Sequence, residues 1–186
     1  MRKIILALFL AVMGAPMAAI ASEPFQLTFP QEASVTEFTD SWGAARSGHR
    51  HQGNDLMAPK MTEVYAAADG VVKWIRDRGS AGRYIVIDHG EGWETWYMHL
   101  NNDHPGTDDG AAPMDLGVAV EEGDEVEAGD LIGWVGDSGN AEGSSSHTHF
   151  ELHRNGYPID PHEYLMDAYR RAMEQVVPVS TLFPVI

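Results

Sequence analysis

Short runs of β-forming residues, each ended by glycine, fill most of this chain of 186 residues. Between Thr28 and Pro158 they include "GVVKWIRD", "RYIVIDHG", "WETWYMHL", "LIGWVG" and "HTHFELH", separated by turn-forming stretches such as "RGSAGR" and "GDSGNAEG". Valine, isoleucine, tyrosine and tryptophan favour strands, whereas glycine with serine or asparagine favours turns. The spacing predicts a mostly β fold, an antiparallel sandwich or barrel-like sheet, rather than a parallel α/β fold.

The pattern changes near the C-terminus. Asp160, Pro161 and Glu163 are residue types typical of a helix N-cap and first turn. Apolar residues then recur at helical spacing, at Tyr164, Leu165, Ala168, Tyr169, Ala172 and Met173. We predict a C-terminal helix and tail over 161–186, with the apolar stripe packed on the core rather than binding a ligand.

The first residues predict export. Arg2 and Lys3 precede "IILALFLAVMG", which is short for a membrane anchor, and "AIA" at 19–21 matches a small-x-small cleavage site. We expect a signal peptide over 1–21 and a periplasmic or secreted mature protein that is free of the membrane. An N-terminal extension, 22–39, is long enough to cover a site but offers no histidine or cysteine ligand. Without cysteine, any zinc must be held by histidine and carboxylate.

Charge narrows the class of partner. The formal net charge of −16 argues against binding nucleic acid through its phosphates and against docking by charge on an anionic membrane. We expect a monomer. The polar segment 101–117 carries four aspartates but no recognised calcium-loop spacing. A long loop of this kind is typically functional or mobile.

Residues 147–153, "HTHFELH", place three histidines on what reads as one strand. Successive strand side chains point to opposite faces. One face therefore carries His147, His149, Glu151 and His153, and the threonine, phenylalanine and leucine between them form the buried face. The histidine face is either a polar, solvated surface or part of a metal site, because imidazole is the commonest protein ligand for zinc.

A second histidine segment is "HRHQGND", residues 49–55. Its His51 and Asp55 flank Gly53, and this glycine with Pro59 favours a loop in which one imidazole and one carboxylate converge. His49 is a rival ligand to His51.

A third segment, "TWYMHL", brings another histidine. Strand alternation puts Thr95, Tyr97 and His99 on one face. A single strand histidine is more often structural than catalytic, but three histidine-bearing segments in a chain with nine histidines favour a shared site. We assign no role to His89, His104 and His162.

Together these segments resemble the lysostaphin-type or LytM-like zinc endopeptidases, which cut peptidoglycan cross-links. The resemblance covers about residues 40–164 and rests on "HQGND", "VYAAADGVV", "WYMHL", "GDEVEAGDLIGWVGDSGNA" and "HTHFELH", in the family's order. It implies a zinc peptidase domain over 40–160 with a β fold of the duplicated hybrid motif type. The implied partners are the peptide stems or cross-bridges of peptidoglycan.

The resemblance also implies a site of five residues. His51, Asp55 and His149 would bind one Zn²⁺, with His99 and His147 as the catalytic histidines. Three protein ligands leave a fourth tetrahedral position for water, which is typical of a catalytic zinc site. His147 would be the general base, and His99 would stabilise the oxyanion or share in proton transfer.

Other positions qualify this assignment. We expect Glu151 to orient a zinc ligand through a hydrogen bond and His153 to be structural or solvated. Met61 stands where the family usually has glycine, which implies a different turn but affects no ligand. The 101–117 segment is longer than in compact members, so a substrate preference does not carry over.

Three other functions compete with that of a zinc-dependent endopeptidase. A catalytically inactive relative would activate cell-wall amidases by contact, but it has no need of two histidines beside an open metal position. A carboxypeptidase with another zinc pattern would have a longer histidine–aspartate spacing. A biotinyl or lipoyl carrier, suggested by "GDEVEAGDLIGWVG", needs a lysine at a tight turn, and Lys3, Lys60 and Lys73 are not so placed.

Overall fold

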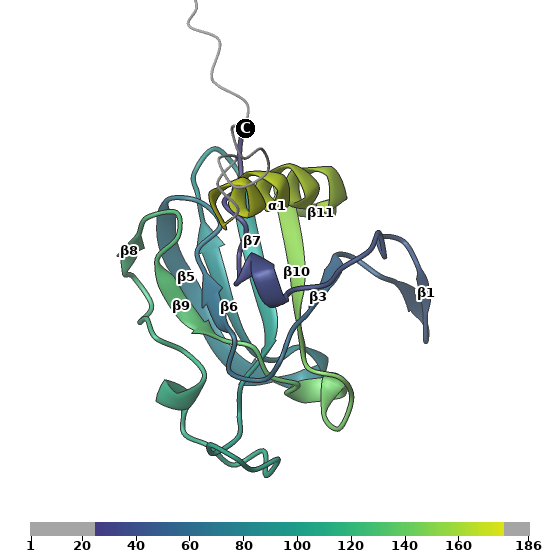
Figure 1. Cartoon of the computed structure of the whole chain (residues 1–186), viewed down its shortest axis with the longest axis vertical. Coiled ribbons are helices and arrows are strands. Elements are labelled where there is room, and N and C mark those ends of the chain that lie inside the picture. Colours follow the sequence, from purple (N-terminus) through teal and green to yellow (C-terminus); the bar gives the residue numbers. More distant parts are fainter. Residues whose placement is uncertain (1–24, 177–186) are drawn as a thin grey trace, which may run out of the picture.

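An antiparallel sheet forms the body of the protein in the computed structural model, which describes residues 25–176 (Figure 1). The predicted signal peptide lies outside the described residues. The strand order is β11-β10-β7-β6-β5-β8, and β3 also pairs with β10. These strands are β3 (Asn54–Met57), β5 (Gly70–Arg78), β6 (Gly82–Asp88), β7 (Trp93–Leu100), β8 (Glu125–Val126), β10 (His147–Arg154) and β11 (Tyr157–Ile159).

Smaller elements complete the fold. A two-stranded sheet of β4 and β9 contributes Val64 and Ile132 to the same core as Ile85, Tyr97 and Phe150 of the main sheet, so the core lies between the two sheets. The remaining elements are β1 (Ala45–Arg46), β2 (His49–Arg50), β4 (Glu63–Tyr65), β9 (Leu131–Trp134), α1 (His162–Val176) and the 3-10 turns η1 (Ala33–Val35), η2 (Gly79–Ala81), η3 (Met114–Leu116) and η4 (Gly139–Ala141). The predicted mostly β, antiparallel class with one C-terminal helix is confirmed.

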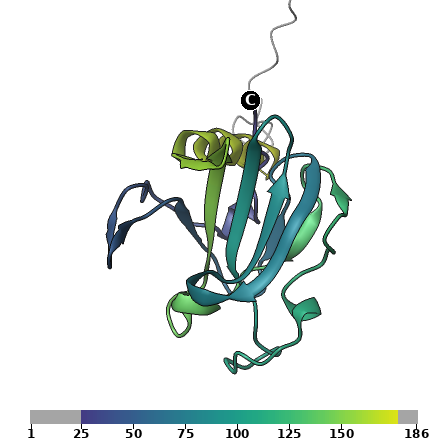
Figure 2. The same cartoon turned by 180° about the vertical axis from the view of Figure 1, so that it is seen from behind.

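Helix α1 lies across one end of the main sheet, as both views show (Figures 1 and 2). Its Leu165 and Ala168 are buried in the core, so the apolar stripe packs as predicted. The described part of the N-terminal extension also joins the core: Phe29 is buried and contacts the ring of Tyr169. No helix within residues 25–176 is long and apolar enough to cross a membrane.

The segment 49–57 is not the loop that its glycine and proline predicted. His49–Arg50 pairs with β1, and Asn54–Met57 forms β3, antiparallel to β10, with Asp55 opposite His149. A Cβ on Gly53 would lie 2.1 Å from the carbonyl oxygen of Phe150. The glycine therefore marks a close approach of two backbones rather than a turn.

The face assigned to His99 was also wrong. Thr95 and Tyr97 point into the core, but His99 lies on the opposite face, where it contacts the ring of His147. Between two successive pairs with β6, strand β7 holds one extra residue, and His99 has a φ of 62°. This β-bulge breaks the alternation and turns the side chain to the other face.

Gly53→Ala should destabilise the protein because the new methyl group has no room against β10. We expect urea unfolding to show a loss of roughly 1–3 kcal/mol in the free energy of unfolding, the usual cost of overpacking. Exposed Gln52 provides the control, since Gln52→Ala should change that free energy little. Equal stability of the two variants would contradict the close packing at Gly53.

Candidate metal centre

Three side chains converge beside the antiparallel pairing of β3 with β10. The Nε2 atom of His51 lies 3.0 Å from Asp55 Oδ1 and 2.8 Å from His149 Nδ1, and the latter two atoms are 3.0 Å apart. Ligand atoms around a tetrahedral zinc with bonds of 2.0–2.1 Å are separated by about 3.3 Å. The three atoms need to spread by only a few tenths of an ångström to hold such an ion, so the donor set and its spacing fit a zinc site.

Hydrogen bonds fix which atom of each ring faces the centre. His51 donates from Nδ1 to the carbonyl oxygen of Ser41 (2.8 Å), which directs Nε2 inward. His149 is held in the reverse sense, because its Nε2 lies 3.0 Å from Glu151 Oε1 and its Nδ1 points inward. An acceptor on the outer nitrogen is the usual way in which a metal-binding histidine is oriented. The contact of Glu151 is the one expected of a residue that orients a ligand.

Charges in the site favour ionised carboxylates. Burial alone would raise the pKa of Asp55, but hydrogen bonds and charges of His149 and His51 hold it well below its usual range. Burial would likewise lower the pKa of His149, but its hydrogen bonds to Asp55 and Glu151 raise it to about 9. Burial would raise the pKa of Glu151, but its hydrogen bonds with His149 and His153 lower that pKa to about 2.

Two more histidines lie beside this group. The ring centroids of His99 and His147 are 5.0 Å apart, and His147 Nε2 lies 3.9 Å from Asp55 Oδ1. Each ring places Nδ1 2.8 Å from a carbonyl oxygen, of Ser138 for His99 and of Ser145 for His147. Because a carbonyl oxygen only accepts, Nδ1 carries a hydrogen, and the neutral form of each ring presents its lone pair at Nε2. Burial and, secondarily, the neighbouring His147 lower the pKa of His99 to about 4.

All five predicted residues thus line one cleft, of about 660 Å³. His49 also lines it but is exposed on the β1–β2 hairpin and does not join the three converging atoms. His153, predicted to be structural or solvated, is buried, 2.6 Å from Glu151 and stacked on the ring of Trp96.

Trp96 and Met98 are among the side chains of this cleft that were not predicted from the sequence, as is Arg46. Trp96 and Met98 alternate with the core residue Tyr97 along β7, so period-two alternation was the signal that locates these two. The three histidines to which no role was assigned, His89, His104 and His162, do not line the cleft.

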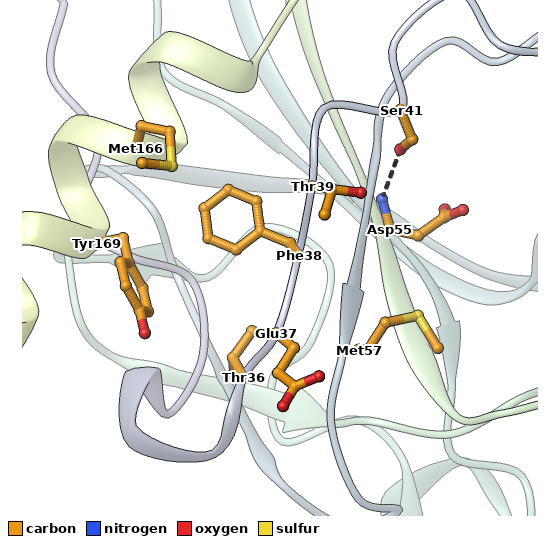
Figure 3. Close-up of a pocket in the computed structure, with 9 residues that line it drawn as sticks. All are labelled: Thr36, Glu37, Phe38, Thr39, Ser41, Asp55, Met57, Met166 and Tyr169. Carbon is orange, nitrogen blue, oxygen red and sulfur yellow. Dashed lines mark hydrogen bonds between the residues drawn. The ribbon is translucent and has the colours of Figure 1, made fainter.

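A second cavity, of about 640 Å³, lies between the 36–39 segment, β3 and α1 (Figure 3). Its walls include the apolar side chains of Phe38, Met166 and Tyr169. Figure 3 shows the carboxylate of Asp55 turned away from Phe38 and Tyr169, while the Asp55 amide nitrogen lies 3.4 Å from Ser41 Oγ. Asp55 lines this cavity too, but its carboxylate points away from the apolar walls.

A second group of acidic side chains lies in and near the 101–117 segment. Carboxylate oxygens of Asp103, Asp108 and Glu142 lie within 4.8 Å of one another. The ammonium group of Lys60 lies 2.7 Å from Asp103 Oδ2 and 2.8 Å from Asp137 Oδ1, and it also pairs with Asp108. A lysine thus balances part of the charge that a bound calcium would balance, and it ties the segment to the residue before Ser138.

Comparisons with known proteins show which family and which relatives this chain is similar to. The model of peptidase family M23 matches residues 49–161. Peptidoglycan DD-endopeptidase ShyA of Vibrio cholerae is 31% identical over 134 residues, which are 72% of this chain and 25% of that protein. DD-carboxypeptidase/endopeptidase Mpg of Neisseria meningitidis is 35% identical over 111 residues, 60% of this chain and 22% of that protein. The matched part is therefore about a quarter of each relative's length.

Two solved peptidase structures resemble this protein in fold. The catalytic domain of lysostaphin from Staphylococcus simulans has a TM-score of 0.57 at 25% identity, over 70% of this chain and 92% of that one. A zinc-containing peptidase from Vibrio cholerae has a TM-score of 0.58 at 26% identity, over 73% of this chain and 39% of that one.

Metal binding should release a proton from His149. With a pKa of about 9, its imidazole is protonated at pH 7, and the Nδ1 proton must leave before a metal binds there. We expect calorimetry in buffers of different ionisation enthalpy to show about one proton released per metal at pH 7. The affinity should fall roughly tenfold for each pH unit below the pKa.

Glu151→Gln should reduce this proton release, because it removes one of the two carboxylates that raise the pKa of His149. His104→Ala, outside the cleft, is the control and should behave as the wild type. Identical heats in all buffers, after correction for dilution, would contradict the protonation state assigned to His149.

Proposed function

The chain belongs to peptidase family M23, as its motifs predicted, and on that basis we propose that it is a zinc-dependent endopeptidase that hydrolyses peptide cross-links of peptidoglycan. The observation that carries the proposal is the pair of imidazole Nε2 atoms beside a three-ligand group. A purely structural metal site is closed by four protein ligands and has no use for two more acceptors at its edge.

In this proposal His51, Asp55 and His149 hold the metal. Two neutral imidazoles and one carboxylate are hard and borderline donors that suit Zn²⁺. Bound zinc polarises a carbonyl oxygen and lowers the pKa of water towards neutrality. The chain fixes the donor atoms through Ser41 and Glu151, so little rearrangement accompanies metal binding.

The two further histidines serve proton transfer. His147 Nε2 is the nearer to Asp55, and its lone pair makes it the general base that takes a proton from the attacking water. The sequence left two roles open for His99, oxyanion stabilisation and proton transfer. The lowered pKa keeps His99 neutral, and a neutral ring with its hydrogen on Nδ1 has no hydrogen at Nε2 to donate to an oxyanion, so a share in proton transfer is the role that its geometry leaves.

The names of the relatives support the substrate. ShyA is named a peptidoglycan DD-endopeptidase and Mpg a DD-carboxypeptidase/endopeptidase, and all five site positions lie within residues 49–161, which the family model matches. We propose the peptide stems or cross-bridges of peptidoglycan as the substrate of a monomeric, exported enzyme. The proposed domain runs over 40–160, after a signal peptide at 1–21 and an extension at 22–39.

Metal content separates this enzyme from a catalytically inactive activator of amidases. The mature wild-type protein should bind about one zinc per chain and release soluble peptides from purified sacculi, identified by mass. Asp55→Asn should bind much less zinc and release none, because an amide cannot neutralise the ion. Stoichiometric zinc without any released product, or no zinc at all, would refute the endopeptidase.

The catalytic histidines should be separable from the ligands. We expect His147→Ala and His99→Ala each to lower kcat/KM for a cross-linked peptide by roughly a hundred- to ten-thousand-fold, while zinc content stays that of the wild type. His104→Ala should leave both quantities unchanged. Retained activity in His147→Ala would show that another group is the base.

A further inference from the structure

Arg46 lies on the β1–β2 hairpin, which projects from the body of the protein next to the metal centre (Figures 1 and 2). The hairpin leads directly into His51, and Arg46 is one of the residues that line the cleft. Its Nη2 atom donates to Asp55 Oδ2 at 2.7 Å, on the side of the carboxylate away from the two imidazoles. A guanidinium group therefore stands at the edge of the site.

The guanidinium is only partly used by the protein. Its side chain is 41% exposed, and among residues 25–176 the Nη2–Asp55 contact is its one hydrogen bond. An arginine carries five N–H donors in a planar fork. Most of these donors therefore have no partner among residues 25–176, and they belong to a side chain that lines the cleft.

Charge distinguishes Arg46 from every other residue of the cleft. Among the described residues that line it, Arg46 is the only lysine or arginine, and the carboxylates Asp55 and Glu151 lie there as well. The whole chain has a net charge of −16. The single permanent cation among the described lining residues of this cleft, in a protein of net negative charge, is suited to one anionic group of a bound substrate.

A bound metal would make the guanidinium group of Arg46 more available to a substrate. A divalent ion held at Asp55 Oδ1 takes up much of the carboxylate's charge and repels the guanidinium beside it. The attraction between Arg46 and Asp55 weakens accordingly, and the fork is free to pair with another carboxylate, which its planar geometry matches.

We propose that Arg46 binds a free carboxylate of the substrate peptide next to the scissile bond and so selects peptides that carry one there. This inference rests on the proposed function, because it takes a peptide as the occupant of the cleft. It names a specificity-determining residue outside the five predicted site positions.

Two cross-linked stem-peptide dimers test the proposal, identical except that the carboxylate beside the scissile bond is a primary amide in one. Zinc-loaded wild-type protein should process the carboxylate dimer roughly ten- to a hundred-fold better, mainly through a lower KM. Arg46→Gln should remove this preference by weakening the carboxylate dimer alone. Arg46→Lys, which keeps the charge but not the fork, should restore part of it.

Arg50→Gln is the matched control. Arg50 is on the same hairpin, but it donates to the carbonyl oxygen of Gly43 and does not line the cleft, so its removal should leave the preference intact. A preference that survives in Arg46→Gln overturns the proposal. So does an equal loss on both dimers together with lost zinc, because Arg46 would then only hold Asp55.

Failure of the proposed function gives a different result. If the wild type cuts neither dimer, calorimetric binding of each dimer to the zinc-loaded protein decides the role of Arg46. Tighter binding of the carboxylate dimer that Arg46→Gln abolishes supports the inference without any catalysis. Equal affinities in the wild type overturn it.

Discussion

The pairing of β3 with β10 is the interaction on which the whole site depends. It sets Asp55 directly opposite His149 in an antiparallel register, so the two side chains are cross-strand neighbours on one face. A slip of one residue would turn Asp55 towards the core. Gly53 protects this register, because only a residue without a side chain fits against the backbone of Phe150.

From that pair, hydrogen bonds run along one strand face. His149 contacts Glu151, Glu151 contacts His153, and the ring of His153 stacks on Trp96 of the neighbouring strand. The side chains of His149, Glu151 and His153 are all buried, and each has a hydrogen-bond partner that offsets the cost of its burial. The result is a rigid support that orients one donor nitrogen of His149 without contacting the metal position itself.

Period-two alternation predicted much of this site from the sequence. It placed His147, His149 and Glu151 on one face of β10, and the structure has them there. It failed at His99, because a bulge depends on the register with the neighbouring strand, which no local pattern records. The loop predicted from Gly53 and Pro59 was wrong for a similar reason, because a glycine that allows close contact with a strand almost a hundred residues away looks like a turn in the sequence.

The separation of the converging side chains along the chain has a consequence for how the protein is made. Asp55 and His149 are 94 positions apart, and their contact exists only when the last long strand has docked. An extended or partly folded polypeptide therefore does not bring these donor atoms together. The convergence of the three donor atoms is thus a property of the completed fold, and no folding intermediate that lacks a docked β10 would possess it.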